Sequence, residues 1–168
     1  RTLLEASGTK PTQVAGVSFS GQMMGCLLVD SRGEPLRRML IWADTRSAPQ
    51  EKAMLEKLDM QATYRITGHR VSASYPAAKL LWVKENQPEL YNKAARMLQA
   101  KEYIIYRMTG QFVTDYSDAS GTNLLDLTQK QWSDELLHAY GIRRDLLPDL
   151  CASSQVAGRI TAEAARRC

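Results

Sequence analysis

Few residues in this sequence combine types and spacings that support catalysis on their own. The most polar segment, residues 113–123, consists of small and hydroxyl-bearing residues, and segments of this kind often carry function. His69 and His138 share no spacing with other ligand-type residues, so both are expected at the surface. The sequence contains neither a Gly-x-x-x-x-Gly-Lys phosphate loop nor the loops of protein kinases. No catalytic residue and no metal ligand is therefore predicted within the chain.

The cysteines indicate neither a disulfide framework nor a structural zinc site. Cys26, Cys151 and Cys168 are an odd number, lie far apart and form no Cys-x-x-Cys pair. Cys26 falls within an apolar run, where packing is expected rather than reactivity. A reducing compartment, the cytoplasm, is the simplest expectation.

Length and composition predict one ordinary globular domain. The chain has 168 residues, of which 44% are hydrophobic and 24% charged. The longest apolar stretch, residues 23–29, is far shorter than the roughly 20 residues that cross a bilayer, so no membrane span is expected. The chain begins without Met or a secretory signal, and we expect it to be a piece of a longer protein.

The charge pattern argues against nucleic-acid binding. The 22 Lys and Arg against 18 Asp and Glu give a net charge of +4, and the sequence pI is about 9.0. The cations form isolated pairs without interleaved aromatic residues. A nucleic-acid binder would require a strong salt dependence of binding, and we expect no such partner.

Hydrophobic patterns predict strands first and helices later. Residues 14–20 and 25–30 are predicted as strands, and the turn residues 31–35 would return the second strand as a hairpin into residues 36–42. Helical spacing, Pro near helix starts and Gly at helix ends predict five helices. They cover residues 45–58, a segment that starts near Pro76, and residues 89–97, 102–109 and 133–140.

One segment resembles a known signature. Residues 74–86, with Lys79 three residues before Trp82, resemble the first signature of the FGGY carbohydrate kinases. Alone, this motif also fits a core Trp beside a Lys whose stem lies along the surface. Here Lys79 and Trp82 are expected to be structural, on a helix that positions one wall of a site.

Two further landmarks follow the order of the same family. Upstream come a Gly-Gln turn within residues 16–25, a hairpin, and the Trp-x-Asp-x-Arg end of residues 42–46. Downstream come the small-residue segment 114–122 and then Asp126 and Trp132. With three matches in order over residues 14–150, the chain is identified as a member of the FGGY family, and it is similar to the xylulokinase branch.

This resemblance implies a fold and a domain position. The fold would be α/β and ribonuclease-H-like, of the actin-type ATPase superfamily, with a short β-hairpin sheet followed by several helices. Residues 1–150 would be the incomplete sugar-binding part of the N-terminal domain. Residues 151–168 would be a fragment edge leading toward a second domain.

The resemblance also implies an activity for the parent protein. The parent would use ATP and Mg²⁺ to phosphorylate a hydroxyl of a ketose, such as the pentulose xylulose, or of a related polyol. The family's Asp-x-Gly-Thr phosphate hairpin, its base Asp and its adenine loops would lie outside this chain, which should be inactive alone. The residues implied to contact the sugar are Gln22, Met23, Met24, Trp42, Asp44, Ser74 and Asp118.

Several of these positions suit a sugar physically. A sugar site needs polar groups for hydroxyls and an aromatic face for the carbon side, which Gln22, Asp44 and Trp42 can offer. Met24 stands where xylulokinases usually have His, so the expectation is a pentulose-like substrate rather than D-xylulose itself. Two alternatives stay open: Trp42 as a core aromatic residue and Asp118 as a helix cap.

A different class of function also fits the sequence. The chain is compatible with a non-catalytic sugar-binding or structural module of the same fold, because its phosphate hairpin is missing. The expected partner in either case is a small-molecule sugar. A homodimer of the parent is a further expectation.

Overall fold

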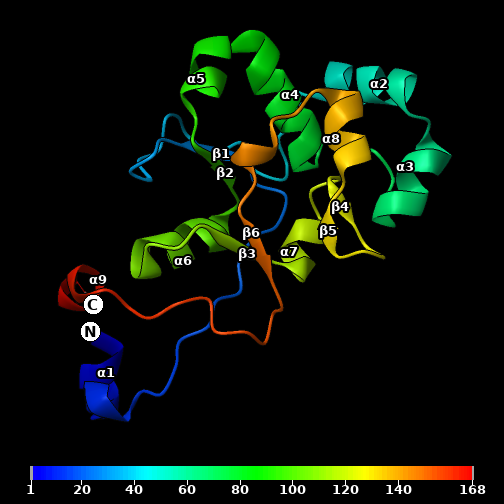
Figure 1. Ribbon diagram of the computed structural model, residues 1–168. Coiled ribbons are helices and arrows are strands. Elements are labelled where there is room, and N and C mark those ends of the chain that lie inside the picture. The colour runs from blue at the N-terminus through cyan, green and yellow to red at the C-terminus, as the bar shows by residue number, and fades with distance from the viewer. Residues whose placement is uncertain (1, 168) are drawn as a thin grey trace.

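The computed structural model describes residues 2–167, which form a mixed α/β fold (Figure 1). The α-helices are α1 (Thr2–Ser7), α2 (Ala48–Lys57), α3 (Met60–Thr67), α4 (Pro76–Asn86), α5 (Pro88–Lys93), α6 (Ala100–Thr109), α7 (Tyr116–Ser120), α8 (Asp134–Tyr140) and α9 (Ala162–Arg167). Short 3₁₀ turns cover Pro11–Gln13 and Arg144–Leu146. The strands are β1 (Leu27–Val29), β2 (Arg96–Leu98), β3 (Val113–Asp115), β4 (Leu125–Asp126), β5 (Gln131–Trp132) and β6 (Asp149–Cys151).

The strands pair in three two-stranded sheets. β1 and β2 are antiparallel, with Leu28 opposite Met97. β3 and β6 are parallel, with Thr114 opposite Leu150. β4 and β5 are antiparallel. Two of these pairs, β1–β2 and β3–β6, join segments far apart in the sequence, so they hold together the elements between them.

The predicted hairpin is only partly confirmed. Residues 25–30 contain β1, but the regular partner of β1 is β2 rather than residues 36–42. The return segment contributes two isolated bridges, Cys26 with Leu40 and Val29 with Pro35. Both edges of β1 are thereby paired, and the side chains of its three residues are buried in the core.

The strand predicted at residues 14–20 is wrong. In the described part of the chain this segment has no strand assignment, and most of it is exposed. Its β-branched residues suit a strand, yet a strand forms only where a neighbour completes its hydrogen bonds. Among residues 2–167, no segment pairs with it as a neighbouring strand.

The helix predictions succeed where local signals dominate. α4 begins at Pro76, and α6 and α8 end before Gly110 and Gly141, whose φ angles of 74° and 64° are left-handed. The helix predicted at residues 89–97 is wrong after Lys93, because the following residues pair with β1 instead. α2 confirms the helix within residues 45–58.

Four short helices, α1, α3, α7 and α9, were not predicted, and two of them begin with an Asp cap. α3 is capped by Asp59, whose carboxylate accepts the N–H of Ala62 at 2.7 Å. α7 lies within the polar segment 113–123, directly after β3. Both starts carry an Asp cap, which is a signal that the sequence contained.

The core lies between α4, α8 and the strands β1 and β2. Its apolar side chains are almost fully removed from water, at roughly 25 cal/mol of stabilisation per Å² of apolar surface buried. Fully buried members include Leu28, Leu40, Met54, Leu80, Met97, Leu124, Leu136 and Leu146. The predicted burial of Cys26 is confirmed, and burial raises the pKa of its thiol to about 12.

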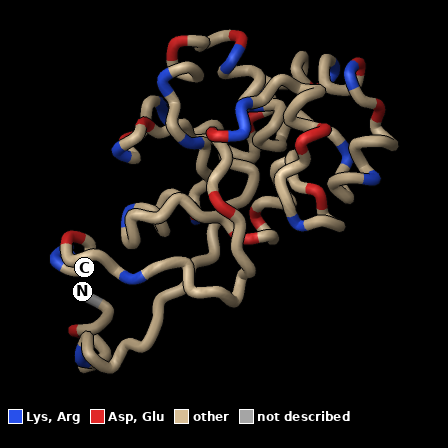
Figure 2. The backbone as a smooth tube through the Cα atoms, viewed as in Figure 1, with Lys and Arg blue, Asp and Glu red and all other residues tan. Residues whose placement is uncertain are grey.

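Two arms run away from this packed body (Figure 1). They are residues 2–22 and residues 152–157. The second arm returns to the body at residues 158–161, where the Thr161 N–H donates to the Met108 carbonyl at 2.9 Å, and it leads into α9, which packs against α6. Figure 2 shows basic and acidic residues interspersed along the body. No helix within residues 2–167 has the length and apolar character needed to cross a membrane.

Candidate functional site

The turn at residues 22–25 is the first predicted sugar-contacting segment, and Met24 sets its geometry. Met24 has a φ of 64°, in the left-handed region that residues other than glycine rarely adopt. Its N–H donates to Gln99 Oε1 at 2.6 Å, and its carbonyl accepts from Lys79 Nζ at 2.8 Å. At Gly25, a Cβ would lie 2.6 Å from Met39 Sδ, so a side chain there would force Met39 to move. The backbone of this turn is thus held on both sides of Met24.

Lys79 connects this turn to the start of α4. Its side chain is fully buried, and its Nζ also donates to the carbonyl of Ser74 at 2.6 Å. Burial lowers the pKa of Lys79, while nearby Cys26 and Asp44 oppose that shift. The alternative in which the Lys79 stem lies along the surface is therefore wrong.

Gln99 connects the same turn to α7. It is fully buried, and its Nε2 donates to the carbonyl of Asp118 at 2.9 Å. Its own N–H donates to Glu102 Oε2 at 2.5 Å, as part of a capping box at the start of α6. One buried amide therefore bridges Met24 and Asp118, which lie on different elements.

The carboxylate of Asp118 faces a cation. Lys101 Nζ lies 3.2 Å from Asp118 Oδ2 and 2.8 Å from Asp115 Oδ2. Burial raises the pKa of Asp118, and the charge of Lys101 acts in the opposite direction. The cap of α7 is Asp115, which accepts the N–H of Asp118 at 2.9 Å, so the cap role considered for Asp118 is wrong.

Trp42 and Asp44 lie on a separate segment before α2. The Trp42 side chain is 57% exposed, so the alternative of a core aromatic residue is wrong. Arg46 Nε lies 2.9 Å from Asp44 Oδ1, and its Nη2 lies 2.9 Å from Oδ2. These hydrogen bonds lower the pKa of Asp44. The Arg46 guanidinium also lies over the Trp82 ring, 4.9 Å from its centroid, which anchors the segment to α4.

The remaining predicted residues differ in how they are held. Met23 is half-buried, and its Cε is the atom that a Cβ at Gly121 would meet at 3.0 Å, so Met23 lies against the end of α7. Gln22 is exposed. The structure therefore links Met23, Met24, Ser74 and Asp118 by direct contacts or shared partners. The negative charge of Asp44 interacts with the positive charge of Lys79, which connects Asp44 to this group. Gln22 and Trp42 face solvent.

The residues that organise this group were missed by sequence reasoning. Gln99 and Lys101 were given no role, although they hold Met24 and Asp118. The Gln-x-x-Glu spacing of Gln99 and Glu102 before an apolar helix is a capping-box pattern, which is a usable signal. The contacts to Met24 and Asp118 join residues distant in sequence and leave no local signal.

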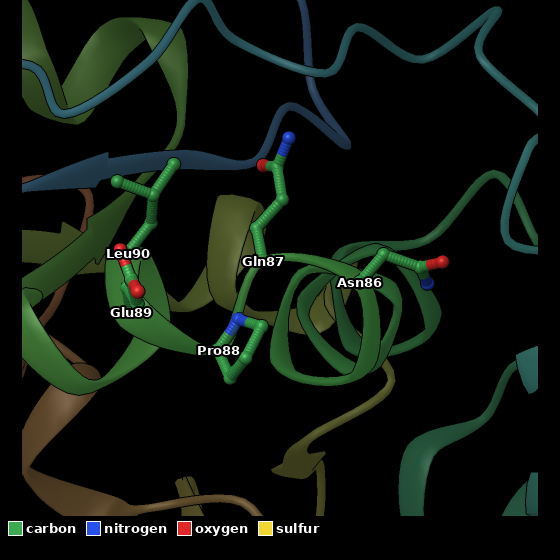
Figure 3. A pocket seen from close by; sticks show the side chains of 5 residues that line it. All are labelled: Asn86, Gln87, Pro88, Glu89 and Leu90. Atoms are coloured by element: carbon green, nitrogen blue, oxygen red, sulfur yellow. The ribbon is translucent and has the colours of Figure 1, made fainter.

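Two surface hollows lie elsewhere on the molecule. One is lined by residues 86–90 where α4 meets α5, as Figure 3 shows. The other lies between α6 and α9 and is lined by Tyr106, Arg107 and Glu163 among others. Neither is lined by a residue predicted to contact sugar.

Comparison with known proteins agrees with the α/β architecture. The family described as "FGGY family of carbohydrate kinases, N-terminal domain" matches residues 1–168. The chain therefore belongs to the FGGY family of carbohydrate kinases. It is 40% identical over 158 residues to the xylulose kinase of Bacillus subtilis (strain 168), covering 94% of this chain and 32% of that protein.

Solved structures support the same assignment. A xyloylose kinase from Brucella ovis superposes with a TM-score of 0.89 at 33% identity, covering 96% of this chain and 34% of that one. A gluconate kinase from Lactobacillus acidophilus gives a TM-score of 0.87 at 30% identity, covering 98% and 34%. The fold is thus that of the actin-like ATPase sugar kinases, as expected. The chain spans about a third of the length of these relatives.

Proposed function

We propose that the protein containing this chain is an ATP-dependent carbohydrate kinase that phosphorylates a hydroxyl of a ketose or related polyol. In this proposal the chain forms one wall of the sugar site. The observation that carries it is the junction at Met24, where Lys79 and Gln99 tie the predicted turn to Ser74 and Asp118. A rigid polar wall suits a substrate whose hydroxyls must be oriented precisely.

The exposed groups among the residues predicted to contact sugar favour a sugar over a compact ligand. Trp42 offers an open aromatic face to the carbon side of a sugar, and Gln22 offers an amide that can donate and accept. Met24 presents an apolar, flexible side chain, and its main-chain polar groups are already engaged. We infer a pentulose-like substrate, in line with the xylulose kinases among the relatives.

ATP and Mg²⁺ are the proposed phosphoryl donor and its cation, and in this proposal both are bound mainly by parts of the protein outside this chain. Among residues 2–167, no group of three or more His, Cys, Asp or Glu side chains is placed to hold a metal ion. The carboxylates of Asp115 and Asp118 both face Lys101. We assign nucleotide binding and the base that accepts the hydroxyl proton to other parts of the protein. The role left to this chain is to orient the sugar.

A cytoplasmic location is part of the proposal. Cys26 and Cys151 are free thiols, as in proteins of reducing compartments. ATP, the proposed donor, is also supplied there.

The test is ADP release by the full-length protein with a panel of ketopentoses, polyols and sugar acids. We expect turnover with one ketose or polyol, and none with the aldose isomer of the same composition as a matched control. Absence of sugar-dependent ADP release from a folded protein would overturn the proposal. Sugar binding without turnover would identify a non-catalytic module instead.

A further inference from the structure

Lys79 is an unusual residue for the interior of a protein. Lysine is almost never fully buried unless its charge is compensated, yet the Lys79 side chain is fully buried within α4. Its hydrogen-bond partners are two main-chain carbonyl oxygens, of Met24 at 2.8 Å and of Ser74 at 2.6 Å. The ammonium group is removed from water, and its hydrogen bonds hold two separate segments of the main chain in place.

The main chain of Met24, which Lys79 holds through the carbonyl, is strained. It is also held through its N–H. Met24 keeps a left-handed φ of 64°, which is strained for a residue that carries a Cβ. Such a conformation persists only where the surroundings over-determine it. On the opposite side of Met24, its N–H is held at 2.6 Å by the fully buried Gln99. Lys79 and Gln99 thus clamp one residue through both of its main-chain polar groups.

We propose that Lys79 is a positioning residue of the sugar site, whose ammonium sets the separation between the turn at residues 22–25 and Ser74. The inference rests on the proposed function, since it assumes that these two segments face the sugar. Lys79 itself contacts no substrate, because it is enclosed behind them. Its loss releases the Met24 carbonyl and the Ser74 carbonyl together, and the sugar loses a preformed wall.

The same helix offers a matched control. Lys84 also lies on α4, and its Nζ also donates to a main-chain carbonyl, that of Gly141 at 2.6 Å. That carbonyl follows the end of α8, away from the residues predicted to contact sugar. Lys84→Met therefore removes the same kind of contact from the same helix without touching the clamp.

The experiment uses steady-state kinetics of the full-length kinase carrying Lys79→Met or Lys84→Met. Methionine matches the length of the lysine stem and lacks the donor. For Lys79→Met we expect the KM for the sugar to rise at least about tenfold, with the KM for ATP changed less than twofold. Lys84→Met should leave both constants within twofold. An unchanged sugar KM in folded Lys79→Met would overturn the inference, whereas a wild-type protein inactive with every sugar would overturn the proposed function.

A second measurement covers a Lys79→Met variant that does not fold. Residue-resolved hydrogen exchange of the wild-type, full-length protein without sugar reports whether the turn that Lys79 positions is held, through the hydrogen bond from the Met24 N–H to Gln99. We expect the Met24 amide to exchange at least about 100-fold more slowly than that of the exposed Gln22. Equal exchange of the two amides would show that the turn is not held, and would overturn the inference.

Discussion

At the scale of single residues, Trp42 is the part of the proposed wall most open to a direct test. Its ring is 57% exposed, so its removal leaves no cavity in the core. In the full-length kinase, Trp42→Ala should raise the sugar KM about tenfold or more through loss of the aromatic face, with the ATP KM unchanged. Steady-state kinetics with each substrate varied in turn checks this.

The control for Trp42 is another aromatic residue of equal exposure. Tyr64 on α3 is also 57% exposed and was not predicted to contact sugar. Tyr64→Ala should leave both KM values within twofold. If the two variants behave alike, Trp42 does not belong to the sugar wall.

The residues of the proposed wall could be named from the sequence only through family resemblance. Nothing local to Ser74 distinguishes it from other polar residues near helix starts, and the polar segment 113–123 does not single out Asp118 among its members. The residues that hold the wall in place are even harder to predict from the sequence, because the contact of Lys79 with Met24 joins residues 55 positions apart. Contacts of this kind depend on how distant elements pack, and a single sequence carries no pattern for them.

At the scale of elements, the turn after β1 depends on one glycine. Gly33 has a φ of 75°, and a Cβ there would lie 1.8 Å from Tyr106 Cε1. Gly33→Ala should therefore destabilise the protein by at least about 2 kcal/mol, from left-handed strain together with overpacking. Chemical denaturation of the variant measures the loss.

Gly110 provides the comparison for that prediction. It has nearly the same φ, 74°, but nothing lies within 4 Å of the position of its Cβ. Gly110→Ala carries only the backbone strain, about 1–2 kcal/mol. Equal losses in the two variants would contradict the contact with Tyr106.

The start of α6 gives the fold a pH dependence. Burial raises the pKa of Glu102 from 4.5 to about 7, the negative charge of Asp118 adds to the shift, and hydrogen bonds from Thr114 and Gln99 oppose it. The folded state therefore holds a proton that the unfolded state releases between these values. Stability should fall as pH rises from about 4.5 to 7, by at most about 1.4 kcal/mol per pH unit.

The variant Glu102→Gln isolates this effect. It cannot ionise, so the slope of unfolding free energy between pH 4.5 and 7 should flatten. The exposed Glu135 in the first turn of α8 supplies the control, and Glu135→Gln should keep the wild-type slope. An unchanged slope in Glu102→Gln would rule out Glu102 as its source.

Elements were predictable where their signals are local. Pro76 at the start of α4, and Gly110 and Gly141 after α6 and α8, act within one helical turn, and those helices were predicted correctly. The pairing of β1 with β2 depends on residues far apart in the sequence. Because of it, the end of the helix predicted at residues 89–97 forms a strand instead. Residues 14–20 have strand composition but no partner, and composition alone cannot supply one.

At the scale of the whole molecule, the structure separates a packed body from two arms. Residues 14–22 belong to the first arm, are mostly exposed and lie outside every paired strand. In the 168-residue chain we expect their amides to exchange within seconds, while those of Leu27–Val29 in β1 remain protected. Hydrogen exchange with mass spectrometry tests this, and protection of residues 14–22 would contradict the unpaired conformation.

The three tryptophans of the chain differ in how deeply they are buried. Trp132 is buried with its indole N–H on the Pro148 carbonyl at 2.9 Å, Trp82 is half-buried under the Arg46 guanidinium, and Trp42 is open to water. An indole in water emits at longer wavelength and is reached by soluble quenchers, whereas an enclosed one is shielded. The fluorescence of Trp42 therefore reports directly on the proposed sugar wall, and ligand binding there can be followed without an added label.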